Sequence, residues 1–224
     1  MRRMFFSSTS MMKRDFLRKL VWGSALVLGL GASLQALAED EAPDALIKRI
    51  STEVLDAIKA DKSMRAGDMN KVIALVDSKI LPNLDFQRMT SSSVGPGWRQ
   101  ATPEQQKRLQ EEFKTLLVRT YSGALAQVSD QSISMKPLRA SAEDKEVVVR
   151  SEVKGSGDPI QLDYRLVKTP GQGAGWKIYN INVLGVWLVE NYKSQFAAEI
   201  NAKGIDGLIA SLVERNKANA NSKK

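Results

Sequence analysis

The 224-residue sequence contains no cysteine and no histidine, and aromatic residues make up only 6% of it. Without these two residue types the protein cannot form a disulfide, a Cys-His or Ser-His-Asp nucleophile, or an ordinary zinc site. The remaining composition, with 43% hydrophobic and 26% charged residues, is typical of a globular domain rather than a disordered or collagen-like chain. This length predicts about one domain with a sizeable buried core.

The net charge of +8 is unevenly distributed along the chain. Residues 1–38 hold six basic side chains and one acidic side chain, whereas the rest holds 27 basic and 24 acidic side chains, a net charge of +3. No basic run is interleaved with aromatic residues, which is the usual pattern of a nucleic-acid-binding surface. We therefore expect no nucleic-acid partner.

Residues 1–38 have the pattern of a signal peptide. A basic stretch precedes the apolar run Leu20–Leu30, and Ala36-Leu37-Ala38 has the small-x-small form that signal peptidase cleaves. A membrane anchor is the alternative, but the apolar run is short and is diluted by Gly and Ser. We expect cleavage near Ala38 and export from the cytoplasm. Lys13-Arg14 resembles a twin-arginine signal with Lys in place of the first Arg, so the Sec route is favoured and the twin-arginine route stays the alternative.

Apolar residues recur at helical spacing in four parts of the mature chain, which predicts amphipathic helices. These parts are 43–60, 69–80, 102–128 and 188–212. Thr102 and Gln105 form a capping box at the start of the longest helix, and Lys203-Gly204 divides the last region into two helices. By composition, 91–98 is expected to be a loop and 216–224 a disordered polar tail.

Between residues 133 and 184 the period changes to the alternation of half-buried β-strands. In the last strand, the apolar positions Ile178 and Ile181 are three residues apart, which indicates a β-bulge near Asn180. We therefore expect a curved sheet that is concave on its apolar side.

Groups that could carry catalysis are scarce. The carboxylates Asp85, Glu152 and Asp163 do not pair, and strand alternation is expected to turn the last two toward solvent. Ser91–Ser93 has no histidine to activate a hydroxyl, and Gly171–Gly175 lies between two strands, so a hairpin turn is favoured over a phosphate loop. We expect a protein that is not an enzyme and that has no metal site and no cofactor.

The apolar faces of the sheet and the helices are compatible with two arrangements. They either cover one another as a normal core or enclose an apolar cavity. Periodicity shows which side of an element is apolar, but it does not show whether the space on that side is filled.

Short motifs are spread along the whole mature chain. They are Ala101-Thr102-Pro103-Glu104-Gln105, Tyr121-Ser122-Gly123-Ala124-Leu125, Gln161-Leu162-Asp163-Tyr164, Gly175-Trp176-Lys177-Ile178-Tyr179-Asn180, Gly185-Val186-Trp187-Leu188-Val189 and Lys203-Gly204-Ile205-Asp206-Gly207-Leu208. In this order and spacing they resemble the toluene-tolerance family, the periplasmic phospholipid carriers of the Mla (maintenance of lipid asymmetry) system.

The resemblance implies an α+β fold, with a curved antiparallel sheet enclosed by several helices and an apolar cavity between sheet and helices. It implies a phospholipid-binding domain over 39–215, whose cavity holds acyl tails as cargo while the headgroup projects to solvent. The implied location is the periplasm. The implied partners are phospholipid, an outer-membrane lipoprotein–porin complex, and an inner-membrane ABC transporter complex with an MCE-domain protein. Trp187 departs from the small polar residue usual in the family, which bears on the width of the cavity mouth.

The expected lipid-binding residues come from the sheet and the longest helix, although some of them are expected to be plain core. They are Leu117, Tyr121, Leu125, Val149, Leu162, Tyr164, Leu166, Ile178, Ile181, Val183 and Val186. Val186 matches a pocket-wall position of the family, so Val186→Glu is predicted to abolish lipid retention and to leave the fold largely intact. Two other functions stay open: a small-molecule enzyme on a similar curved-sheet fold, and a lipid-free periplasmic adaptor with a filled core.

Overall fold

The sheet is antiparallel throughout, and its five strands lie in chain order. In the computed structural model, which describes residues 40–221 except 127, 129 and 142, they are β1 (Ser132–Met135), β2 (Glu146–Lys154), β3 (Ile160–Lys168), β4 (Trp176–Val183) and β5 (Val186–Trp187). Sequential antiparallel strands need only short connections, which the Gly-rich segments 155–159 and 169–175 provide. The signal peptide expected over 1–38 lies outside the described residues.

The expected β-bulge is confirmed in β4. Arg165 pairs with Asn180 and Leu166 pairs with Ile178, so Tyr179 is the extra residue. The inserted residue restores the phase of the strand, and Ile178 and Ile181 therefore point to the same face of the sheet although they are three residues apart.

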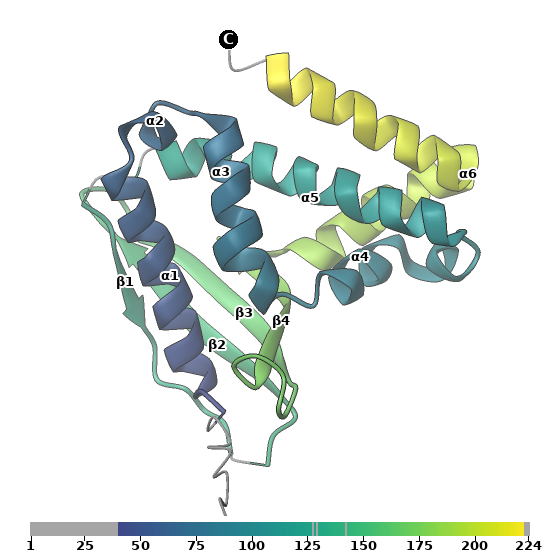
Figure 1. Cartoon of the computed structure of the whole chain (residues 1–224). Coiled ribbons are helices and arrows are strands. Elements are labelled where there is room, and N and C mark those ends of the chain that lie inside the picture. Colours follow the sequence, from purple (N-terminus) through teal and green to yellow (C-terminus); the bar gives the residue numbers. More distant parts are fainter. Residues whose placement is uncertain (1–39, 127, 129, 142, 222–224) are drawn as a thin grey trace, which may run out of the picture. The chain divides into compact units, whose positions relative to one another are not determined.

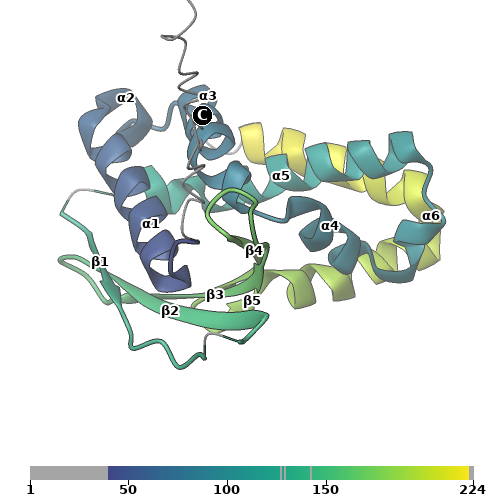
Figure 2. The same cartoon turned by 60° about the horizontal axis from the view of Figure 1, so that its bottom comes forward.

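Helices pack against one face and one edge of this sheet. They are α1 (Pro43–Ala60), α2 (Lys62–Arg65), α3 (Met69–Leu75), the π-helix η1 (Val76–Ile80), the 3-10 helices η2 (Leu81–Asn83) and η3 (Gly95–Arg99), α4 (Phe86–Val94), α5 (Pro103–Ala126) and α6 (Leu188–Asn221). Figures 1 and 2 show α1 along the face of β1 and β2, whereas α4 and α6 pack beside β4, and α5 and α6 run side by side. The helices expected over 43–60 and 102–128 are confirmed as α1 and α5, whereas the helix expected over 69–80 is α3 followed by the π-helix η1. The α+β class follows from this arrangement.

The capping box of α5 is also confirmed. The Gln105 N–H donates to Thr102 Oγ1 at 3.2 Å, and the Thr102 N–H donates to Gln105 Oε1 at 2.9 Å. This reciprocal pair satisfies two of the backbone donors that the start of a helix leaves without partners. Local chemistry therefore sets where the longest single helix begins.

The prediction of a loop over 91–98 is wrong, because most of this segment is helical. Asp85 caps α4 by accepting from the Arg88 N–H at 3.0 Å, and the helix continues to Val94. The serine hydroxyls are satisfied inside the helix: Ser91 donates to the Arg88 carbonyl at 3.1 Å, and Ser93 to the Met89 carbonyl at 2.9 Å. Hydroxyls that bond back to the preceding turn are compatible with a helix, although composition alone favours a loop.

The prediction of a disordered tail over 216–224 is also wrong for the part that the structure describes, since α6 runs to Asn221. Asn216 is buried, and its amide donates to Glu112 Oε2 at 2.6 Å. This tertiary contact with α5 supplies the stabilisation that the polar composition of the segment lacks. Residues 222–224 lie outside the described residues.

Gly204 separates the two helical parts of α6, as its sequence position predicts. Its φ of 70° and ψ of −171° lie in a region that only glycine occupies without strain. We expect Gly204→Ala to lower the free energy of unfolding by about 1–3 kcal/mol, measured by urea denaturation. Gly157→Ala is the matched control, because its added Cβ meets nothing within 4 Å and its φ is not positive, so no loss is expected. Equal stability of the two variants would contradict this account of the kink.

The buried apolar residues form two clusters rather than one. One cluster joins α1 to the sheet and includes Leu46, Ile58 and Leu166. The other joins α4, α5 and α6 around Phe113. Ile181, on β4, packs against both clusters and thus marks the place where they meet.

Candidate functional site

An apolar cavity of about 390 Å³ lies at the junction of the two clusters. Its volume falls within the range of about 300–1,000 Å³ that is typical of ligand pockets. Of the 24 residues that line it, 19 are aliphatic, methionine or phenylalanine. The other five are Ser51, Lys114, Tyr121, Gln131 and Tyr164. The two apolar layers therefore do not close completely against each other.

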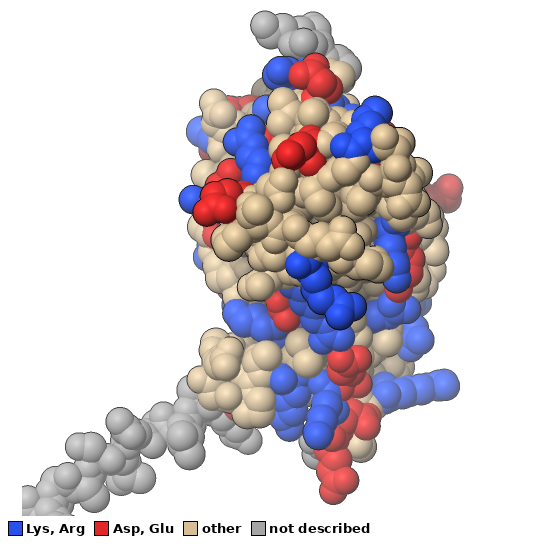
Figure 3. Space-filling view, turned by 90° about the vertical axis from the view of Figure 1, so that its right-hand side faces the viewer, with Lys and Arg blue, Asp and Glu red and all other residues tan. Residues whose placement is uncertain are grey.

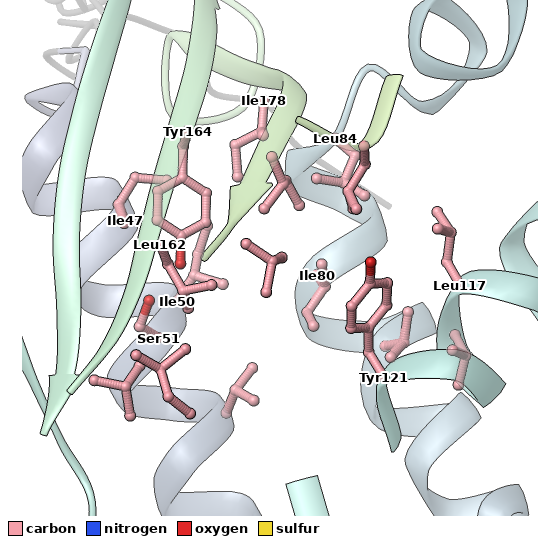
Figure 4. A pocket seen from close by; sticks show the side chains of 18 of the residues that line it. Ile47, Ile50, Ser51, Ile80, Leu84, Leu117, Tyr121, Leu162, Tyr164 and Ile178 are labelled. Carbon is pink, nitrogen blue, oxygen red and sulfur yellow. The ribbon is translucent and has the colours of Figure 1, made fainter. Parts of the chain in front are cut away.

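The cavity walls come from elements far apart in the sequence. Figure 4 shows Leu162, Tyr164 and Ile178 from the sheet on one side, and Leu117 and Tyr121 from α5 on the other. Ile181 and Val183 of β4 also line the cavity. Seven of the eleven residues expected from the sequence thus line one space, although their role in lipid binding stays a prediction.

The other four residues do not line the cavity within the described part of the structure. Val149 and Leu166 are fully buried in the cluster under α1, where they act as plain core. Val186 lies on β5, is 48% exposed and pairs with the cavity residue Val183. Leu125 lies on α5 among residues whose side chains are not described. The predicted effect of Val186→Glu on lipid retention stays a prediction.

Sequence reasoning missed the wall that α1 and the π-helix provide. Ile47, Ile50 and Val54 of α1 line the cavity, as do Val76 and Ile80 of η1. The apolar stripe of α1 was visible as a helical period, but a stripe does not reveal whether it faces a packed sheet or an open space. A π-helix has no comparable sequence signal, although such turns are frequent at functional sites.

The polar groups inside the cavity are mostly uncharged. Burial raises the pKa of the Tyr164 phenol, against smaller opposing contributions from hydrogen bonds with Ser51 and Ser151. Burial likewise raises the pKa of Tyr121. Both phenols therefore stay neutral at physiological pH, and Figure 4 shows Tyr164 beside Ser51 of α1. Apart from Lys114, the described residues that line the cavity place no charge against apolar chains.

The opposite face of the sheet is polar, and it corrects two expectations. Asp163 was expected to face solvent but is only 8% exposed, because it lies on the central strand β3 between its paired neighbours Arg150 of β2 and Asn182 of β4. Asn180 accepts from the Val189 N–H of α6 at 3.1 Å. Trp187 does not line the cavity: the Arg165 guanidinium stacks on its ring at 4.0 Å. In this structure Trp187 covers the outer face instead of narrowing the cavity.

The described residues offer little for catalysis or membrane crossing. No aspartate or glutamate lines the cavity, and within the described ranges no cluster of acidic side chains could hold a metal ion. Over the same residues, no helix has both the length and the hydropathy needed to cross a bilayer. The face shown in Figure 3 carries acidic and basic residues interspersed around a broad uncharged area, which is unlike the continuous basic surface that binds nucleic acid.

Comparison with known proteins identifies the family. Residues 48–214 match the family described as MlaC protein. The chain belongs to the MlaC family. The resemblance found in the sequence motifs is thereby confirmed.

Individual MlaC relatives cover most of the chain. Toluene tolerance protein ttg2D of Pseudomonas putida is 27% identical over 190 residues, which are 81% of this chain and 86% of that protein. The intermembrane phospholipid transport system binding protein MlaC of Haemophilus influenzae is 24% identical over 196 residues, which are 85% of this chain and 91% of that protein.

A solved structure is more similar in sequence to this MlaC-family chain. It is a phospholipid-binding protein from Ralstonia solanacearum, solved in complex with a phospholipid. It is 49% identical, has a TM-score of 0.76, and the match covers 79% of this chain and 98% of that chain. The match therefore covers nearly all of that relative and most of this MlaC-family chain.

Proposed function

We propose that this protein is a phospholipid carrier of the Mla system, which holds acyl tails in the cavity between the sheet and the helices. One observation carries the proposal: the apolar cavity lies in a chain that is 49% identical to a protein solved with a phospholipid. The protein is a binding protein and not an enzyme, in agreement with its family. Its finer role is to move lipid between the inner and outer membranes and so maintain outer-membrane asymmetry.

The energetics of tail burial explain why a carrier is needed. Two acyl chains of about fifteen CH₂ groups each, at about 0.8 kcal/mol per CH₂, give about 24 kcal/mol for removing the tails from water. Free lipid therefore does not cross an aqueous gap at a useful rate. A cavity of similar apolarity to the membrane makes transfer nearly isoenergetic, so the handover is reversible and its direction is set by the partners.

The proposal includes the location and the partners. The protein works in the periplasm after its leader is cleaved near Ala38. It receives lipid from one complex and delivers it to the other, and these complexes are an outer-membrane lipoprotein–porin complex and an inner-membrane ABC transporter complex with an MCE-domain protein. Membership of the MlaC family supports this assignment.

The experiment that tests the function is organic extraction of the purified protein, followed by mass spectrometry. We expect diacyl phospholipid bound to the protein after size-exclusion chromatography. A preparation without lipid that also fails to load from phospholipid micelles would support a lipid-free adaptor instead. A bound small metabolite in place of lipid would favour an enzyme on this fold.

A further inference from the structure

Lys114 is the single charged residue among those that line the cavity in the described part of the chain. It belongs to the stripe of α5 that faces the cavity, which continues through Leu117, Val118 and Tyr121. The preceding positions on this helix face, Gln110 and Glu111, do not line the cavity. Lys114 therefore marks the end of the cavity lining along α5.

The ammonium group of Lys114 lies where the cavity meets water. Its side chain is 28% exposed, and Nζ is 2.9 Å from Oδ1 of Asp77, whose side chain is 43% exposed. A lysine can lay its alkyl stem along an apolar wall while its charged end reaches solvent. Asp77 belongs to η1, and its neighbour Val76 also lines the cavity. The ion pair thus spans the seam between α5 and η1.

A phospholipid in this cavity must leave its phosphate at such a border. The tails are stabilised by the apolar walls, whereas a buried phosphodiester would lose its hydration without compensation. A partly exposed Lys–Asp pair contributes little net free energy, so a second anion can displace the carboxylate. An ammonium binds phosphate as a point charge without strict geometry, which suits a mobile headgroup.

We infer that Lys114 is a specificity-determining residue that exchanges Asp77 for the phosphodiester of the bound lipid. This inference rests on the proposed function and deepens it. The contact between Lys114 and the phosphodiester makes the carrier selective for lipids with a phosphate over neutral diacyl lipids with the same tails. Asp77 acts as a competing anion that occupies Lys114 in the empty protein.

The test is a competition between two lipids with identical acyl chains. The purified protein is incubated with mixed detergent micelles that contain equal amounts of phosphatidylglycerol and diacylglycerol, and is then re-isolated for mass spectrometry. We expect Lys114→Met to lower the phosphatidylglycerol-to-diacylglycerol ratio by about three- to tenfold, with total bound lipid unchanged. Lys114→Arg should keep most of the preference, and Asp77→Asn should raise it because the competing carboxylate is lost.

Lys107→Met is the matched control, since Lys107 is an exposed lysine on the same helix and does not line the cavity. It should keep the wild-type ratio. The inference is overturned if Lys114→Met keeps that ratio too, or changes it no more than Lys107→Met does. Soluble glycerophosphoglycerol should leave the ratio unchanged, and a change would assign the site to free phosphate esters instead. If the wild-type protein loads neither lipid, the carrier function fails rather than the role of Lys114.

Discussion

Purified Ile181→Glu protein is expected to retain at least about tenfold less phospholipid than the wild-type protein. Ile181 lines the cavity and is the residue that packs against both core clusters, so its side chain lies at the junction where the tails are proposed to bind. A carboxylate among acyl chains loses its hydration and gains no partner, which costs several kcal/mol, and about 1.4 kcal/mol already lowers affinity tenfold. The measurement is bound lipid per protein, by extraction and mass spectrometry.

Two further variants make this result interpretable. Ile181→Val keeps the site apolar and removes only a methyl group, so lipid retention should persist with a stability loss of about 0.5–1.5 kcal/mol. Leu162→Glu places the same charge on the neighbouring strand, at a position that is only partly buried, and should also empty the cavity. Circular dichroism checks the fold of each variant. If both glutamate variants fold and keep wild-type lipid, the tails do not occupy this cavity.

The largest expected loss of stability comes from Phe113→Ala. Phe113 is fully buried in the helical cluster, where its ring contacts those of Tyr192 at 4.9 Å and Phe196 at 5.2 Å, both edge to face, and stacks near Phe86 at 6.0 Å. Truncation removes these contacts and leaves a void, so the free energy of unfolding should fall by about 3–5 kcal/mol. Chemical denaturation at neutral pH measures this quantity.

A matched substitution separates the aromatic contacts from simple volume. Phe113→Leu fills most of the space and should cost clearly less than Phe113→Ala. Phe113 does not line the cavity, so lipid retention by the leucine variant should match the wild type. A loss below about 1 kcal/mol for Phe113→Ala would mean that the helical cluster does not hold α5 in place as the structure indicates.

Local chemistry explains which features were predictable from the sequence. The capping box at Thr102 and the break at Gly204 depend on a few neighbouring residues and on backbone sterics, and both are confirmed. The bulge near Asn180 could be predicted because Ile178 and Ile181, three positions apart, would lie on opposite faces of an unbroken strand. The failures at Ser91–Ser93 and at Asn216 arose where hydrogen bonds to the backbone or to a distant helix outweighed local composition.

The sequence by itself determined the order of most elements, the apolar faces of those elements and, through its motifs, the family to which the chain belongs. Tertiary structure alone decided that these apolar faces enclose a cavity, that α1 and η1 supply part of its wall, and that Lys114 lies at its border. Val149 and Tyr164 show why: both point inward from paired positions on adjacent strands, yet one is packed core and the other lines the cavity. Periodicity records the direction of a side chain, whereas the distance to the opposing layer depends on how helices far apart in the sequence pack together.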